Sequence, residues 1–486
     1  MYNFFILSCC KLDDLTHLND PYNYLEHIKS IRLLFCRFAS VSKNDTTSSG
    51  LGRFGAAIVE SPLGVKGVGG TEQAWGHITV RPHAHMFWWL YYTTANVSHF
   101  TERPLIIWLQ GGPGMPSSGY GNFLEIGLLN INLTERDHSW VKHFNILFVD
   151  NPVGVGFSYF SSRSAKMTQN NKEIGRDLVS FLKTFLNNHA EFQKVPLYIF
   201  GESYGGKMAV EFAYQLVQEI SEGNLIVHFK GIGLGDAYIS PIHYILNYGS
   251  FALNLGLVDK KAYNEISNLT EEVITAIDNH DFLTASDIEA KITDTVIKAT
   301  QGIDVYNIVL KSNMSAFPRF LSYQDSCNQL MNTKIKESLN ISADIEWNFI
   351  NDDIYSALQG DLMRPVTETS NVILVFFLLF VFLLNFFLVE KLLNNTNIKV
   401  IVYNGVFDFL VNTAGTVMWL DNLKWSRSLE WQETNKQPLE IDMVNEAYVK
   451  EVGNLVFYTV LRAGHSVPID NTIAMEAILK RELLST

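Results

Sequence analysis

Residues 196–208 read PLYIFGESYGGKM, and this stretch decides the fold of the chain. Its apolar first half is typical of a short buried strand, and the residues that follow Gly206 indicate the start of a helix. Ser203 stands between them at the apex of a turn, with glycines on both sides. Glycine suits these positions because a side chain would clash where the backbone turns so sharply. Strand, turn and helix with serine at the apex predict a nucleophile elbow.

The signals on both sides of this elbow predict an α/β-hydrolase fold with an inserted, mainly helical cap. Strands and helices alternate from Trp75 onward, which is typical of a sheet covered by helices. Residues 240 to about 360 are more polar and have apolar residues at helical spacing, so we expect them to interrupt the sheet. The predicted organisation is an uncertain N-terminal extension at 1–71, a first part of the core at 72–239, a helical cap at 240–369, an apolar insertion at 370–388 and a second part of the core at 389–486.

A serine hydroxyl becomes a good nucleophile when a histidine takes its proton and an acid orients that histidine. In α/β-hydrolases these residues follow the order serine, acid, histidine along the chain. His465 lies in a glycine-containing loop after a predicted strand, and Asp408 comes just after another strand end. We therefore expect Ser203, Asp408 and His465 to form a triad; the alternatives are a surface histidine and a solvated turn carboxylate. Asp236 also follows a strand but precedes the cap, so we expect it to be a wall or hydrogen-bonding residue.

Acyl transfer also requires backbone N–H groups that face the oxyanion of the transition state. Tyr204, the residue after the nucleophile, is expected to supply one of them. The second is expected from the glycine-rich loop that follows the predicted strand at 105–109. Gly112 is the candidate because Pro113 has no N–H to donate; the alternative is an ordinary Gly-Pro turn.

The composition disfavours several classes of partner and cofactor. The 486 residues carry a formal net charge of −13, which argues against nucleic acid and anionic membranes as partners. The four cysteines lack the spacing of a metal site, and triad chemistry needs neither a metal nor an organic cofactor. N-glycosylation sequons favour a secretory route to a secreted or lysosome-like location, although the chain shows no clear signal peptide. The sequons begin at Asn44, Asn96, Asn132, Asn268, Asn313, Asn340 and Asn394.

Several motifs, in this order along the chain, resemble those of the serine carboxypeptidase family. They span residues 108–114, 150–159, 201–206 and 464–465, and runs at 87–92 and 206–208 are most similar to the retinoid-inducible branch. The resemblance implies an enzyme that releases C-terminal residues from peptides or proteins through an acyl-enzyme on Ser203. A related acyltransferase or esterase and an inactive binding homologue stay open as alternatives, and the oligomeric state is left open.

The resemblance also implies that the substrate's terminal carboxylate binds at Gln110, Gly111, Glu125 and Glu202. A carboxylate beside the nucleophile would repel that group unless it were protonated. Burial and a second carboxyl raise the pKa of such a group, so Glu202 is expected to donate a hydrogen bond in acid. Activity is therefore expected to favour acidic pH. The alternative is a charged elbow residue that faces solvent.

A few positions depart from the pattern of the family. Met115-Pro116 stands where this branch usually continues with glycine and serine, and Pro116 removes a backbone donor. Leu124 precedes Glu125 where relatives often carry two acids, and Ser466 follows the histidine where methionine is frequent. These departures bear on the oxyanion loop, on the carboxylate site and on the pocket for the leaving residue.

Residues 372–389 form an apolar run that nearly crosses a hydrocarbon layer of ~30 Å. The run lies between Ser203 and the pair Asp408 and His465, so a single crossing would separate the nucleophile from its base. We therefore expect the run not to span a membrane. Either it packs as an apolar element, or it is absent from the functional protein because residues 370–388 are translated non-coding sequence; we favour the second.

The sequence that flanks the run is consistent with this hypothesis. Joining Thr369 to Val389 would place Val366, Val389, Leu392 and Leu393 at the spacing of one helix face. The joined segment is therefore expected to form an amphipathic helix.

Overall fold

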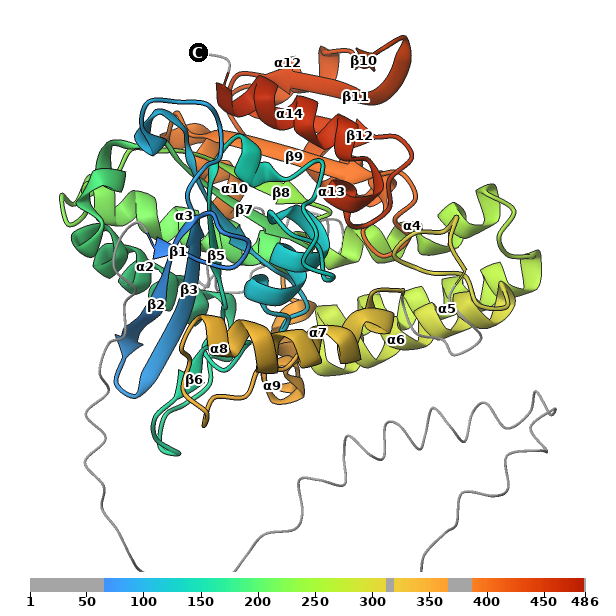
Figure 1. Ribbon diagram of the computed structural model, residues 1–486. Helices are drawn as coiled ribbons and strands as arrows, with labels where there is room; N and C mark the ends of the chain where they lie inside the picture. The colour runs from blue at the N-terminus through green and yellow to red at the C-terminus, as the bar shows by residue number, and fades with distance from the viewer. Residues whose placement is uncertain (1–64, 312–318, 366–386, 485–486) are drawn as a thin grey trace, which may run out of the picture. The chain divides into compact units, whose positions relative to one another are not determined.

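A mixed sheet runs through the centre of the computed structural model, which describes residues 65–311, 319–365 and 387–484 (Figure 1). The strand order is β1-β2-β3-β5-β4-β7-β8-β9-β12-β11-β10, with β6 paired to β3. The strands are β1 (Val65–Lys66), β2 (Glu72–Arg81), β3 (Ala84–Tyr91), β4 (Leu105–Leu109), β5 (Asn145–Val149), β6 (Tyr159–Phe160), β7 (Leu197–Glu202), β8 (Phe229–Gly235), β9 (Lys399–Gly405), β10 (Gln437–Ile441), β11 (Val444–Val452) and β12 (Leu455–Val460).

The strands from β5 through β4, β7, β8 and β9 to β12 run parallel and are apolar because helices cover both faces. Successive residues of β4 show this: Ile107 packs in one core cluster, and Ile106 and Trp108 pack in the other. The first cluster includes residues of α2 (Asn171–Asn188), α3 (Tyr204–Ser221) and α10 (Phe387–Asn395). The second includes residues of η4 (Ser117–Ile126) and α14 (Thr472–Leu484).

A series of helices interrupts the sheet between β8 and β9, where the sequence predicts a helical cap. Its helices are α4 (Pro241–Asn254), α5 (Lys260–Asp278), α6 (Phe282–Ala299), η7 (Arg319–Tyr323), α7 (Gln324–Leu330), η8 (Met331–Ile335), α8 (Lys336–Ser338) and α9 (Asp352–Leu362). Figure 1 shows α5 and α6 side by side and reaching away from the sheet. Asp259 and Asp281 cap these two helices by accepting hydrogen bonds from the N–H groups of Ala262 and Thr284. The predicted α/β-hydrolase fold with a helical insertion is confirmed.

The edges of the sheet differ in part from the prediction. Strands β2 and β3 pair antiparallel as a hairpin at this edge. Val65 and Lys66 pair with Gln73 and Glu72, so the sheet begins before the expected start near Glu72. The antiparallel hairpin of β10 and β11 was not predicted, because its strands alternate without a long apolar run. The remaining short helices are η3 (Phe100–Glu102), η5 (Trp140–Lys142), η6 (Ala190–Lys194), α11 (Thr413–Asp421), α12 (Ser428–Glu433) and α13 (Val467–Asp470).

The apolar run at 372–389 lies outside the described residues except for its last positions. Helix α10 begins at Phe387, and it buries Val389, Leu392 and Leu393 in the core, with exposed fractions of 0 to 5%. These residues share one face, as the sequence predicts, whereas Val366 lies outside the described residues. Among the helices that the structure describes, none has both the length and the apolar character needed to cross a membrane.

Candidate active site

Ser203 sits in a strained turn between β7 and α3. Its φ of 59° and ψ of −125° fall outside the regions that a serine ordinarily occupies. Both flanking glycines are required by close approach. A Cβ on Gly201 would lie 2.2 Å from the carbonyl oxygen of Gly205, and a Cβ on Gly205 would lie 2.1 Å from that of Leu109. These are rigid backbone contacts, so the predicted elbow geometry is present.

The carboxyl ends of four neighbouring strands bring the predicted polar residues to one edge of the sheet. Ser203 follows β7, Asp236 follows β8, Asp408 lies just beyond β9, and the loop after β12 carries His465. The Ser203 N–H donates to the Gly235 carbonyl at 3.0 Å, which ties the elbow to the end of β8. This edge is where ligands bind in open parallel sheets.

His465 and Asp408 form a buried hydrogen-bonded pair. Nδ1 of His465 lies 2.7 Å from Oδ2 of Asp408, and the two residues are 5% and 0% exposed. The other carboxylate oxygen of Asp408 accepts the N–H of Val411 at 3.0 Å. The backbone N–H of His465 donates to the carbonyl of Tyr306 at 2.7 Å, and the Tyr306 ring packs edge-on against the imidazole. Both the position and the orientation of the imidazole are therefore fixed.

Asp236 lies against this pair. Its Oδ1 accepts hydrogen bonds from the Gly405 N–H at 2.9 Å and from the Asn404 side chain. Three residues could offer ligand atoms to one metal ion here: Asp236, Asp408 and His465. One such atom from each lies within 4.8 Å of the other two. However, two ligands of a tetrahedral zinc ion stand about 3.4 Å apart when each bond is about 2.1 Å. The 2.7 Å separation of His465 and Asp408 is therefore the geometry of a hydrogen bond.

The glycine-rich loop after β4 lies directly over the elbow. A Cβ on Gly111 would lie 2.8 Å from that of Ser203 and 3.2 Å from the backbone nitrogen of Tyr204. Tyr204 is the first residue of α3, a position at which the N–H has no acceptor within the helix. In the described loops, the N–H of Gly112 has no backbone acceptor. Two such backbone donors suit the stabilisation of an oxyanion.

The departures at Met115 and Pro116 do not prevent the loop from being held in place. Ser117 accepts the N–H of Gln110 at 3.1 Å and donates to the carbonyl of Trp108 at 3.1 Å. Asp150, which belongs to the second motif, accepts both the N–H and the hydroxyl of Ser118. The donor that Pro116 lacks is therefore replaced by side-chain contacts on its C-terminal side.

The residues predicted to bind the substrate carboxylate converge next to the elbow. Oε1 of Glu202 accepts hydrogen bonds from Gln110 Nε2 at 3.3 Å and from Ser466 Oγ at 3.2 Å. The Trp108 indole donates to the amide oxygen of Gln110 at 2.7 Å, which turns the amide nitrogen toward Glu202. Glu125 on η4 is 1% exposed, and neither of its carboxylate oxygens has a fixed donor among the described residues.

Two carboxyl groups in one dry site cannot both be ionised at low cost. Burial raises the pKa of Glu125 to about 7. Burial, and then the negative charge and hydrogen bond of Glu125, raise the pKa of Glu202 well above its usual range. These raised pKa values favour a proton on the pair in acid, the state in which it has a hydrogen to donate.

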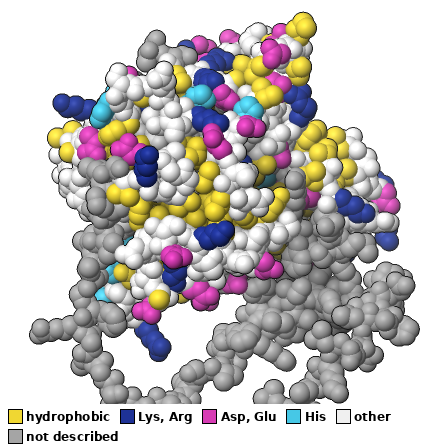
Figure 2. All heavy atoms as spheres, in the orientation of Figure 1, with side chains coloured by type: hydrophobic (Ala, Val, Ile, Leu, Met, Phe, Trp, Pro, Cys, Tyr) yellow, Lys and Arg dark blue, Asp and Glu magenta, His cyan; other side chains and the backbone are white. Residues whose placement is uncertain are grey.

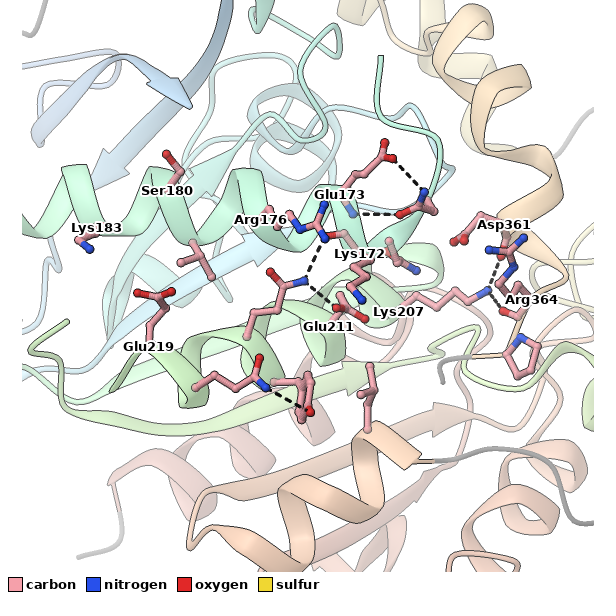
Figure 3. A pocket seen from close by; sticks show the side chains of 18 of the residues that line it. Lys172, Glu173, Arg176, Ser180, Lys183, Lys207, Glu211, Glu219, Asp361 and Arg364 are labelled. Atoms are coloured by element: carbon pink, nitrogen blue, oxygen red, sulfur yellow. Dashed lines mark hydrogen bonds between the residues drawn. The ribbon is translucent and has the colours of Figure 1, made fainter. Parts of the chain in front are cut away.

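Two cavities differ in their relation to this site. The smaller, of about 290 Å³, adjoins it, since Tyr120, Tyr306 and Ser466 are among its lining residues. The larger, of about 830 Å³, lies between α2, α3 and the end of α9, and none of the predicted site residues lines it (Figure 3). There Lys207 donates to the carbonyls of Asp361 and Leu362 at 2.7 and 2.8 Å, and so joins the helix that follows Ser203 to the helical insertion.

Sequence reasoning missed several contacts in the site. Ser466 was expected only as a departure from methionine, but its hydroxyl links the histidine loop to Glu202. Tyr306 and Asn404 were not singled out, although they contact His465 and Asp236. No motif marks these two residues, because their roles depend on which strands and loops lie side by side.

The comparisons with known proteins agree with this geometry. A family model described as serine carboxypeptidase matches residues 64–382 and 384–484. The retinoid-inducible serine carboxypeptidases of Mus musculus and Homo sapiens are each 36% identical over 423 residues, which cover 82% of this chain and 88% of theirs. Serine carboxypeptidase-like 51 of Arabidopsis thaliana is 31% identical over 431 residues, or 82% of this chain and 89% of its own.

A solved structure supports the fold independently. A prohormone-processing carboxypeptidase from Saccharomyces cerevisiae superposes with a TM-score of 0.70 at 22% identity, covering 85% of this chain and 91% of that one. The family resemblance that the motifs suggest is thereby confirmed. The chain belongs to the serine carboxypeptidase family and is an enzyme of that class.

Proposed function

We propose that Ser203, His465 and Asp408 are the triad of this serine carboxypeptidase, and that Glu125 and Glu202 hold the free carboxylate of the substrate. The observation that carries the proposal is the buried pair of carboxyl groups beside the elbow, Glu125 and Glu202, which Ser466 joins to the histidine loop by a hydrogen bond to Glu202. A related esterase or acyltransferase would not need such a pair, because its substrates have no terminal carboxylate to read.

Acylation follows from the positions of these groups. His465, oriented by Asp408 at Nδ1, takes the proton of Ser203 with its other ring nitrogen. The Ser203 oxygen attacks the carbonyl carbon of the last peptide bond, and the resulting oxyanion accepts hydrogen bonds from the N–H groups of Gly112 and Tyr204. The imidazolium then gives its proton to the leaving amine, so that the C-terminal residue departs and an ester on Ser203 remains.

Deacylation repeats these steps with water as the nucleophile, and it restores the free serine. The specificity for a chain end comes from the carboxylate site. A substrate carboxylate is expected to accept hydrogen bonds from the protonated carboxyl pair and from the N–H of Gly111. Binding of the carboxylate then fixes the chain end at one distance from Ser203, so only the last peptide bond is placed next to the nucleophile.

A peptide with a free C-terminus is expected to be cleaved at least about 100-fold more efficiently than the same peptide with an amidated end. The free carboxylate needs the carboxyl pair in its protonated form. For the free-acid peptide, kcat/KM is therefore expected to fall as the pH rises through about 7, where Glu125 loses its proton. Release of the terminal amino acid, followed by mass spectrometry from pH 4 to 8, measures both effects.

The variant Glu202→Gln keeps a donor at this position but cannot ionise. We expect it to retain activity toward free-acid peptides and to lose less of that activity at alkaline pH than the wild type does. Glu211→Gln is the matched control, because Glu211 is also a buried glutamate with a raised pKa but bonds Gln215 on the side of α3 shown in Figure 3. Equal cleavage of the amidated and free-acid peptides would contradict the assignment of the carboxylate site.

We also propose that the protein follows the secretory route and carries N-linked glycans. The sequon asparagines that the structure describes are all exposed, as glycan attachment requires. They are Asn96, Asn132, Asn268, Asn340 and Asn394. Acidic and basic side chains are interspersed over the described part of the face in Figure 2, rather than gathered in one basic patch. Protein from a eukaryotic host is expected to lose apparent mass on treatment with an N-glycosidase, and an unchanged mass would contradict glycosylation.

A further inference from the structure

Among the residues that the structure describes, Asp236 carries an acidic group that lies beside the histidine–aspartate pair and that the proposed mechanism leaves unused. It is 1% exposed, and its Oδ1 already accepts two hydrogen bonds, from Asn404 and from the Gly405 N–H. Its Oδ2 is buried and has no donor among the described residues. That oxygen therefore remains for an interaction with Asp408, because one carboxylate oxygen of Asp408 lies within 4.8 Å of one of Asp236.

The backbone holds Asp236 rigidly in this position. Its φ of 39° lies in the left-handed region, which aspartate and asparagine tolerate better than most residues. Its N–H donates to the carbonyl of Tyr403 at 2.9 Å. Asn404 also donates to the carbonyl of Val411, whose own N–H donates to Asp408. The side chains of Asp236 and Asp408 are thus fixed to one another through the end of β9.

The charged and titratable groups around Asp236 are almost all acidic. Asp408 faces it from the loop after β9, and Tyr403 faces it from β9 itself. Glu202 faces it from the end of β7, and His465 from the loop after β12. Burial, and then the charge of Asp408, raise the pKa of Asp236 well above its usual range. Ionised Asp236 would therefore place a second negative charge against Asp408, and no lysine or arginine is among the described groups that act on its pKa.

We infer that Asp236 is a positioning residue, whose neutral carboxyl donates a hydrogen bond to Asp408 and so fixes the orientation and charge of the group that aligns His465. A carboxylate has room for this bond, because its two oxygens can accept about four hydrogen bonds in total. The donated bond draws negative charge away from the side of Asp408 that faces the imidazole. The electrostatic attraction between Asp408 and a protonated imidazole is thereby reduced.

This inference rests on the proposed triad. It makes two separable predictions about the acidic limb of the pH profile of kcat/KM, which is the range where activity falls as the pH is lowered. That limb reports protonation of the catalytic base in the free enzyme. Asp236→Asn keeps the donor, the acceptor and the backbone conformation and is always neutral, so its acidic limb is expected to coincide with that of the wild type. Asp236→Ala removes the donor, and its acidic limb is expected to move to higher pH by about one unit.

An ionised Asp236, or an Asp236 without the hydrogen bond to Asp408, would give different results. If Asp236 were ionised in the working enzyme, Asp236→Asn would remove a negative charge and move the acidic limb to lower pH, which would overturn the inference. An unmoved limb in Asp236→Ala would overturn the hydrogen bond to Asp408. Asp236→Asn still decides the charge state if the alanine variant does not fold.

Asp177→Asn is the matched control, because Asp177 is buried to a similar degree on α2 but pairs with Arg81. It is expected to lower stability without moving the acidic limb. Active-site titration corrects each rate for the fraction of folded enzyme. A wild-type enzyme that released no C-terminal residue would contradict the proposed function itself, whereas the position of the limb addresses Asp236 alone.

Discussion

Ser203→Ala is expected to lower kcat by on the order of 10⁴ to 10⁶ and to abolish labelling by a serine-directed phosphonate probe. The variant removes the only atom that forms the acyl-enzyme, while the residues proposed to bind the carboxylate are untouched. KM is therefore expected to change far less than kcat. Release of the terminal residue, measured by mass spectrometry with enzyme concentrations high enough to detect slow turnover, gives both constants.

Ser221→Ala is the control for this prediction. Ser221 ends the same helix, is exposed, and donates only to the carbonyl of Gln218. It is expected to leave kcat, KM and probe labelling unchanged. A Ser203→Ala variant that kept more than a tenth of the wild-type kcat would show that the nucleophile lies elsewhere.

Asp408→Asn is expected to lower kcat by on the order of 10⁴. The carboxylate of Asp408 lies 2.7 Å from Nδ1 of His465, and in the proposed triad this contact leaves the other ring nitrogen to act on Ser203. An asparagine would present its N–H₂ to the same nitrogen and favour the wrong tautomer, in which the base cannot take the serine proton. Because Asp408 is fully buried and is not among the residues proposed to bind the substrate carboxylate, KM is expected to remain within about threefold of the wild-type value.

The control is again Asp177→Asn, which makes the same chemical change in a buried aspartate far from the elbow. We expect its kcat to equal that of the wild type. Thermal denaturation of both variants separates a loss of catalysis from a loss of fold. If Asp408→Asn kept near wild-type kcat, a different acid would have to orient His465, and Asp236 would be the group in reach.

The positions of the residues proposed to carry the chemistry could be predicted because each follows a strand that the sequence marks clearly. The runs at 197–202, 399–405 and 455–460 are continuous and apolar, as buried parallel strands are. The carboxyl ends of parallel strands meet at one edge, so Ser203, Asp408 and the loop of His465 were expected together there. Chain order then distinguished the roles of serine, acid and base.

The contacts among these loops could not be predicted in the same way. Asp236 was placed in the wall of the site, but its position against Asp408 depends on β8 and β9 being neighbours in the sheet. The bond from Ser466 to Glu202 likewise requires the β12 loop to reach across to β7. Strand order is set by packing over the whole chain, so local patterns do not contain it.

The direct test of the account is the fate of one synthetic peptide with a free C-terminus, incubated with wild-type enzyme and with Ser203→Ala from pH 4 to 8. Mass spectrometry reports which bond is cut. We predict stepwise loss of single C-terminal residues by the wild type, fastest at acidic pH, with no loss from the amidated peptide or from the Ser203→Ala sample. Cleavage at internal bonds, or equal release by both proteins, would contradict a carboxypeptidase that works through Ser203.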